Sequence, residues 1–120
     1  AGVAPMMFEI DAGILGDARS AETLCYYDGE RIFIVRHDAR NFYVHSIDDH
    51  ASFQSYWVVE ITPAQEADIK EKKIKLRELI CRADPLMYFQ AYHDGRLELF
   101  RVYDPSNFPD DYFPDQDVTL

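Results

Sequence analysis

The residues best suited to chemistry lie in one short stretch that contains two imidazoles and two carboxylates. They are His45, Asp48, Asp49 and His50. Imidazole and carboxylate groups bind zinc or iron where about three of them converge, and the metal then lowers the pKa of a bound water molecule. The spacing of these four residues matches no established metal motif, and aspartates are also common in turns between strands. A small metal-dependent enzyme is therefore an alternative hypothesis.

A second group of carboxylates lies in the C-terminal sequence NFPDDYFPDQD. These are Asp110, Asp111, Asp115 and Asp117, and the glycine and closing glutamate of a calcium-binding EF-hand loop are missing. The same sequence contains three aromatic residues and two prolines, a composition that is unusual for a disordered tail. We expect residues 104–120 to form an acidic arm that lies against the domain, with aromatic rings inward and aspartates outward.

Nucleophilic catalysis has little support in the sequence. There is no G-x-S-x-G elbow, P-loop, G-x-G-x-x-G or H-E-x-x-H motif. Cys25 and Cys81 are the only cysteines, and they lack the close spacing of a zinc or redox site, so a reducing compartment is expected. Cys25 falls in a predicted strand, where cysteine usually behaves as a small hydrophobic residue. We predict no cofactor, and an enzyme is less expected than a binding domain.

Composition and charge restrict the class of protein. The 120 residues are 48% hydrophobic, which fits one domain over residues 1–120, with residues 1–7 expected to be a remnant before the native start or disordered. No apolar run is long enough to span a membrane, so we expect a cytoplasmic protein. The 22 acidic and 12 basic residues give a net charge of −10, which repels nucleic acids and favours a basic protein partner.

The elements that would position these residues are strands joined by hairpins, with helices in the middle of the chain. Asp28-Gly29 and Asp94-Gly95 are typical of tight hairpin turns, and a longer turn is expected over residues 37–41. Thr62-Pro63 predicts a helix start, followed by one or two short helices over residues 63–82 with a bend near Lys73. Strands are predicted at residues 24–27, 31–36, 42–47, 54–61, 87–92 and 97–102. This order predicts an α+β fold, in which an antiparallel, meander-rich sheet packs against the helices on one face.

Several of these motifs together resemble an uncharacterised bacterial domain-of-unknown-function family. They are the YYDG hairpin, the helix start after SYWVVEITP, the segment IKLRELI, and the ending FPDDYFPDQDVTL, and they extend over residues 24–120. The resemblance implies the same fold boundaries and carries no known activity.

The leading hypothesis is a non-enzymatic interaction or regulatory domain that binds a basic protein through an acidic, tyrosine-rich surface. The candidate residues are Tyr112, Asp110, Asp111, Asp115 and Arg77. Arg77 is included because a guanidinium group can bind a carboxylate through two hydrogen bonds. An accessory domain, or an antitoxin- or immunity-like inhibitor in bacterial or phage conflict, is a further alternative. Unpaired edge strands in a hairpin-rich sheet also make a homodimer reasonable.

Overall fold

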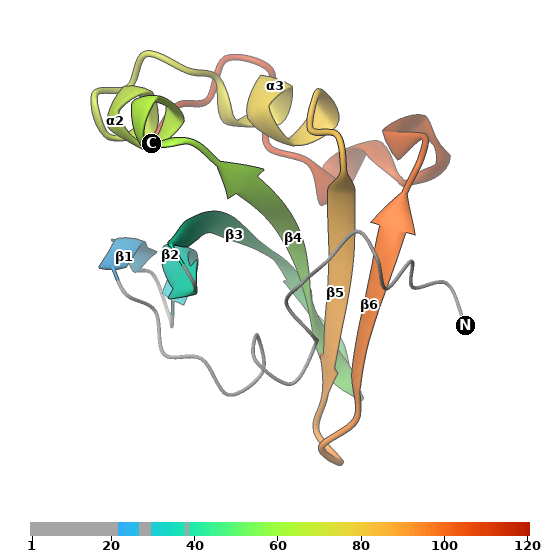
Figure 1. The fold of residues 1–120 in the computed structure, drawn as a ribbon. Helices are drawn as coiled ribbons and strands as arrows, with labels where there is room; N and C mark the ends of the chain where they lie inside the picture. The colour runs from blue at the N-terminus through green and yellow to red at the C-terminus, as the bar shows by residue number, and fades with distance from the viewer. Residues whose placement is uncertain (1–21, 27–29, 38) are drawn as a thin grey trace.

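The described residues fold into one antiparallel sheet with two α-helices on one side (Figure 1). The computed structural model describes residues 22–26, 30–37 and 39–120, so the predicted Asp28-Gly29 turn and residues 1–7 lie outside the described part. The strands follow one another across the sheet in chain order. They are β1 (Glu22–Tyr26), β2 (Glu30–His37), β3 (Arg40–Asp49), β4 (Phe53–Ile61), β5 (Leu86–Tyr92) and β6 (Leu97–Val102). The predicted α+β meander is confirmed.

The turns differ in how well the sequence predicted them. Gly95, between β5 and β6, has a φ of 95°, which confirms that the second Asp-Gly pair forms a turn requiring glycine. Between β2 and β3 the pairing of His37 with Arg40 leaves only two residues, so the longer turn predicted there is wrong. Ala39 adopts a left-handed φ of 62° at this position, a conformation that its side chain does not favour and that the sequence therefore did not indicate.

Two short helices connect β4 to β5, in agreement with the bend predicted near Lys73. Helix α2 (Pro63–Lys70) begins with a capping box, in which the Thr62 hydroxyl accepts a hydrogen bond from the Gln65 backbone N–H at 3.1 Å. The Gln65 side chain in turn accepts one from the Thr62 N–H at 2.9 Å. Lys72 has a left-handed φ of 62°, which ends this segment before α3 (Leu76–Cys81). Among the described residues, no helix is long and apolar enough to cross a membrane.

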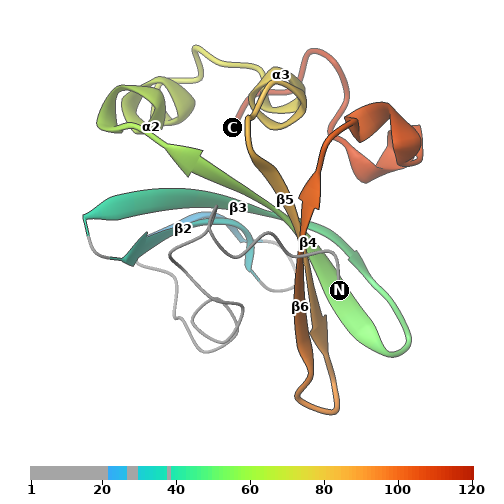
Figure 2. The same cartoon turned by 45° about the vertical axis from the view of Figure 1, so that its right-hand side comes forward.

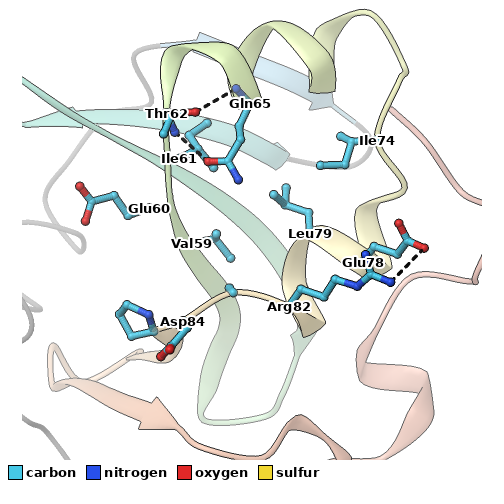
Figure 3. Close-up of a pocket in the computed structure, with 12 residues that line it drawn as sticks. Val59, Glu60, Ile61, Thr62, Gln65, Ile74, Glu78, Leu79, Arg82 and Asp84 are labelled. Carbon is cyan, nitrogen blue, oxygen red and sulfur yellow. Dashed lines mark hydrogen bonds and ion pairs between the residues drawn. The ribbon is translucent and has the colours of Figure 1, made fainter.

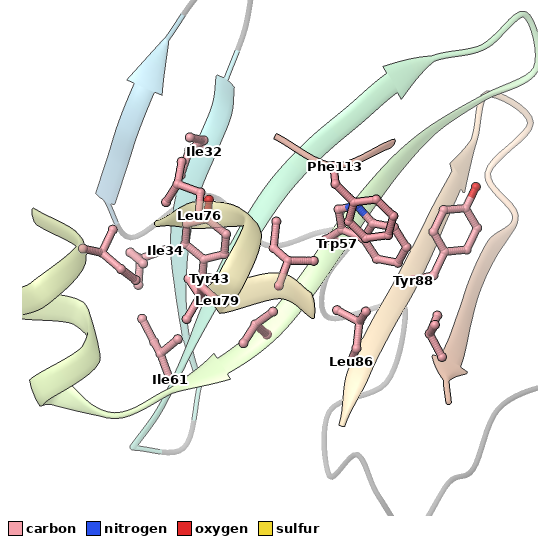
Figure 4. Close-up of a cluster of buried hydrophobic side chains, with 14 residues drawn as sticks. Ile32, Ile34, Tyr43, Trp57, Ile61, Leu76, Leu79, Leu86, Tyr88 and Phe113 are labelled. Atoms are coloured by element: carbon pink, nitrogen blue, oxygen red, sulfur yellow. The ribbon is translucent and has the colours of Figure 1, made fainter. Parts of the chain in front are cut away.

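The core is built on both faces of the sheet. On the face covered by the helices, Trp57, Val59 and Ile61 from β4 pack against Leu79 and other residues of α3 (Figure 4). A second buried cluster lies on the opposite face. It consists of Val35, Phe42, Val44, Val58, Met87, Phe89 and Leu99. The sheet is strongly twisted, so that β2 and β3 run across the direction of β5 and β6 in Figure 2.

The capping box makes a testable contribution to stability. Replacing Thr62 with alanine removes the side-chain acceptor for the Gln65 N–H, and we expect the free energy of unfolding to fall by about 1 kcal/mol. Replacing Thr62 with serine keeps the hydroxyl and serves as the matched control, for which we expect little change. Urea denaturation of the two variants measures the difference, and equal losses of stability would contradict this role of the hydroxyl.

Candidate interaction surface

The C-terminal arm, residues 104–120, is fixed to the sheet by the side chain of Trp57, which is fully buried. Its indole Nε1 donates a hydrogen bond to the backbone carbonyl of Tyr112 at 2.8 Å. The indole ring stacks on Phe113, with 4.9 Å between ring centroids, and meets Phe108 edge-on at 5.0 Å. Figure 4 shows the Trp57 and Phe113 rings lying face to face. The predicted inward orientation of the aromatic residues is confirmed for Phe113, which is buried.

Arg77 of α3 holds the arm from the other side. Its guanidinium donates a hydrogen bond to the Pro114 carbonyl at 3.1 Å, forms an ion pair with Asp110, and lies 5.5 Å from the centre of the Phe113 ring. Further along, the Leu76 N–H donates to the Val118 carbonyl at 3.0 Å. The arm, which contains the short 3-10 turns η2 (Pro105–Asn107) and η3 (Asp110–Tyr112), therefore lies along α3 as well as on the sheet.

The carboxylates of the arm face solvent. The arm contains five aspartates and no lysine or arginine, and all five are exposed. Asp110 is paired with Arg77, Asp117 with Lys75 at 3.2 Å, and Asp104 accepts hydrogen bonds from Ser106. Within the described part of the chain, Asp111 and Asp115 form no ion pair. Of the three predicted interaction carboxylates of the arm, Asp110 is thus paired within the chain, whereas Asp111 and Asp115 remain available to a partner.

Tyr112 is influenced by carboxylates from two distant parts of the chain, which the sequence did not predict. Burial raises the pKa of its phenol, and the Tyr88 phenol and then the Asp111 and Asp48 carboxylates raise it further. The hydroxyl therefore stays protonated at neutral pH and can donate a hydrogen bond. Asp48 comes from the end of β3, far from the arm in sequence, so only the fold brings it near Tyr112. We call Tyr112, Asp111 and Asp48 the acidic patch.

Several grooves lie beside α3 in the described part of the chain, and two of them contain apolar walls that could take a side chain of a partner. The larger, about 520 Å³, is formed by the end of β4, α2 and α3, with Val59, Ile74 and Leu79 on its walls (Figure 3). Its charged residues already have partners within the chain, since Glu78 pairs with Arg82 at 3.9 Å and Asp84 with Arg101 at 2.7 Å. The smaller groove, about 330 Å³, belongs to the arm. It is lined by Arg77, Cys81, Pro105, Ser106, Phe108, Asp110 and Phe113.

The two histidines of the predicted metal cluster have different hydrogen-bond partners. His45 Nδ1 lies 2.7 Å from the Tyr43 hydroxyl, whereas His50 Nε2 lies 3.3 Å from the Ser55 hydroxyl, and the His50 ring stacks on Phe53. Asp48 belongs to the acidic patch, and the Asp49 side chain lies outside the described residues. In the described part of the chain, no three His, Cys, Asp or Glu residues are grouped so that they could hold a metal ion.

The potential nucleophiles are poorly placed for attack on a substrate. Ser55 is fully buried, and its hydroxyl donates to the backbone carbonyl of Asp48 at 3.4 Å as well as contacting His50. Cys81 is a free, half-buried thiol whose pKa is raised by burial, which disfavours the reactive thiolate. The Cys25 side chain lies outside the described residues. These surroundings suit structural roles for Ser55 and Cys81.

The tyrosines are distributed between the core and the surface. Tyr43 and Tyr88 are buried in the main core, and Tyr56 and Tyr92 are half-buried, each donating its hydroxyl hydrogen to a glutamine two residues earlier on the same strand. Among the tyrosines whose side chains the structure describes, Tyr103 is the exposed one, at 79%. Among the described tyrosines, Tyr112 is the one whose phenol lies close to aspartate carboxylates that raise its pKa.

The role of Arg77 in fixing the arm can be tested with a conservative change. Lysine retains the charge at position 77 but cannot bind both the Asp110 carboxylate and the Pro114 carbonyl in the fork geometry of arginine. We expect Arg77→Lys to lower the free energy of unfolding by about 1 kcal/mol and to speed amide exchange in residues 108–114. Trp57 is the single tryptophan, so its fluorescence reports directly on the packing of the arm.

The matched control is Arg82→Lys, because Arg82 lies on the same helix segment and makes only a 3.9 Å contact with Glu78. We expect this variant to have native stability and an unchanged tryptophan emission spectrum. Equal effects of the two substitutions would contradict a specific role for Arg77.

The lowered pKa of His45 predicts that the protein loses stability in acid. Burial lowers its pKa from 6.5 to about 4, so the ring is neutral at neutral pH, and its Nδ1 shares one hydrogen with the Tyr43 hydroxyl at 2.7 Å. Above pH 6.5 the ring is neutral whether the chain is folded or unfolded. As the pH falls from 6.5 to 4, the unfolded chain binds a proton that the folded protein excludes, so the free energy of unfolding falls by up to about 3 kcal/mol.

Urea denaturation between pH 7 and pH 4 measures this effect, with His45→Asn as the comparison. Asparagine keeps an acceptor for the Tyr43 hydroxyl but does not titrate, so we expect a shallower loss of stability in this pH range. Parallel pH profiles for the two proteins would show that other groups account for the acid sensitivity.

Comparison of the chain with protein-family models, with curated proteins and with solved structures found no match. The resemblance noted in the sequence therefore stays a prediction. The functional argument depends on the contacts and charges of the residues themselves.

Proposed function

We propose that this protein is a non-enzymatic interaction domain that binds a basic segment of a partner protein over its C-terminal arm. The observation that carries the proposal is the acidic patch, in which the Asp111 and Asp48 charges help to raise the pKa of the Tyr112 phenol, on an arm whose five aspartates are all exposed. A lysine or arginine side chain supplies positive charge for the carboxylates and an apolar stem for the aromatic ring. This pairing of groups is the chemistry expected for a basic partner.

The net charge of −10 supports the same proposal at longer range. A negative protein attracts a positive partner and accelerates its encounter, and this attraction is screened as the salt concentration rises. The arm groove adds a place for an apolar contact, because Phe108 and Phe113 line it next to the Asp110 carboxylate. We therefore expect the partner segment to combine basic residues with at least one aliphatic or aromatic side chain.

The anchoring of the arm also favours binding. Trp57 and Arg77 hold the backbone at Tyr112 and Pro114, so the carboxylates are already in place before a partner arrives. A surface that is ordered in advance loses less conformational entropy on binding than a tail that must fold. An inhibitor of the antitoxin or immunity type in a reducing cytoplasm is one form that such a domain takes. The resemblance to a bacterial domain family is consistent with that setting.

A lysine-rich peptide with one central phenylalanine tests the proposal by isothermal titration calorimetry at low salt. The variant is Asp111→Asn together with Asp115→Asn, which neutralises the two arm aspartates that form no ion pair within the described residues. We expect it to bind roughly three- to tenfold more weakly, since each exposed charge pair contributes about 0.2–1 kcal/mol. Raising the salt concentration should weaken binding to the native protein more than binding to this variant.

The matched control is Asp68→Asn together with Asp94→Asn, which changes the net charge by the same amount at exposed sites on α2 and on the β5–β6 hairpin. We expect this control to bind the peptide with nearly native affinity. Equal weakening by both pairs of substitutions would mean that the peptide responds to net charge alone, and the arm would then have no specific role.

A further inference from the structure

The two edges of the sheet differ in regularity. The sheet order places β1 at one edge and β6 at the other. Pairing between β1 and β2 is interrupted by register shifts on both sides of Cys25, and irregular edges of this kind hinder the addition of another strand. Pairing between β5 and β6 is regular throughout, from Leu86 with Val102 to Ala91 with Leu97. The β6 edge is therefore the better template for a further strand.

The hydrogen-bond pattern shows which backbone groups of β6 face outward. The Tyr92 N–H donates to the Arg96 carbonyl at 2.8 Å, which makes this a hydrogen-bonded pair. Because such pairs alternate along an antiparallel ladder, the backbone groups of even-numbered β6 residues point toward β5 and those of odd-numbered residues point away. Within the described part of the chain, no residue forms a hydrogen bond with the outward N–H groups of Leu97 and Leu99.

An exposed aromatic side chain lies at the end of this edge. Tyr103, directly after β6, is 79% exposed, and the Arg101 guanidinium lies 4.6 Å from the centre of its ring. Arg101 is also paired with Asp84 at 2.7 Å, so its positive charge is balanced within the chain. Exposed tyrosines beside arginines are enriched at protein interfaces. The edge is thus a strand template with an aromatic side chain beside it.

A second copy of the chain would pair with β6 across a two-fold axis, because identical partners form self-complementary contacts. The outward N–H and C=O groups belong to odd-numbered residues, and each must pair with an odd-numbered residue of the second copy. This condition is met only when the two-fold axis passes through a residue, which then lies opposite itself. With the axis at Glu98, the Glu98 carboxylates of the two copies lie opposite each other. With the axis at Leu99, Asp94 faces Asp104. Both arrangements bring like charges together and are disfavoured.

Axes at Arg101 and at Phe100 give opposite results for the charged side chains. An axis at Arg101 places that residue opposite itself, with Glu98 opposite Asp104. An axis at Phe100 places the two Phe100 rings across from each other and Arg96 of each copy opposite Asp104 of the other. Arg96 also pairs with Asp94 of its own chain at 3.1 Å, so Asp104 of the second copy would share this cation with Asp94. The same register sets the exposed Tyr103 opposite Leu97, an aromatic–aliphatic pair of the kind that stabilises sheets. Charge and apolar complementarity therefore agree on a single register.

We propose that two copies of this protein join their β6 strands antiparallel, with the two-fold axis at Phe100, into one continuous sheet. The evidence is the regular β6 edge, whose outward Leu97 and Leu99 N–H groups have no partner among the described residues, together with the exposed Tyr103 and the opposite charges of Arg96 and Asp104. This assembly does not depend on the proposed binding of a basic partner.

Site-directed crosslinking tests the register. In a background with Cys25 and Cys81 replaced by alanine, Phe100→Cys places two thiols opposite each other at a non-hydrogen-bonded pair. The Cα separation at such a pair, about 4.5 Å, is within the range of disulfides. We expect a covalent dimer after mild oxidation. The control Glu98→Cys lies opposite Val102, so its two thiols are separated by about 13 Å along the strand and should not crosslink.

Analytical ultracentrifugation of the native protein over a concentration series gives a second measurement that needs no cysteine. We expect a monomer–dimer equilibrium, whose Kd rises roughly tenfold in Arg96→Glu and in Asp104→Lys. Combining the two substitutions restores the opposite charges and should recover much of the affinity. A monomer at every concentration, or equal crosslinking of Phe100→Cys and Glu98→Cys, would overturn the proposal, as would capture of strand peptides by a protein that stays monomeric.

Discussion

The packing of the Trp57 indole between the sheet and the C-terminal arm is the interaction on which the rest of the structure depends. The residue lies on β4 in the helix-facing core and contacts Tyr88 on the neighbouring strand, Phe108 and Phe113. Its N–H bonds the Tyr112 carbonyl, so a polar group buried in the core is satisfied by the arm itself. Without the arm, this N–H and the aromatic face of the core would lose these partners.

The acidic surface follows from this anchoring. Five aspartates on a segment of 17 residues repel one another, and a free tail would reduce that repulsion by spreading out. The arm stays folded because its aromatic rings are buried and because Arg77 and Lys75 neutralise Asp110 and Asp117. The basic side chains of the α3 segment thus serve to hold the arm, and the charges left over are those that can act on a partner.

The sequence predicted the strands and helices well, because local rules determine them. Thr62-Pro63 specifies a helix start through capping, and the second Asp-Gly pair specifies a hairpin. The candidate site was less predictable, because it depends on contacts between distant segments. Asp48 was read with its neighbours as a possible metal ligand, whereas the fold places it near Tyr112. The tight turn at Ala39 was missed because alanine carries no signal for a left-handed conformation.

Because the arm follows β6 directly, the β6 edge and the acidic patch are connected by a short segment of the chain. Asp104 ends the strand and also caps η2 by accepting a hydrogen bond from the Ser106 N–H at 3.0 Å, so the β6 edge passes into the arm without a flexible linker. A contact that fixes the end of β6 therefore also restricts the start of the arm. Packed aromatic rings also run from Phe100 of β6 through Tyr88 and Phe108 to Trp57. The proposed assembly at the β6 edge can influence binding at the acidic patch through these contacts.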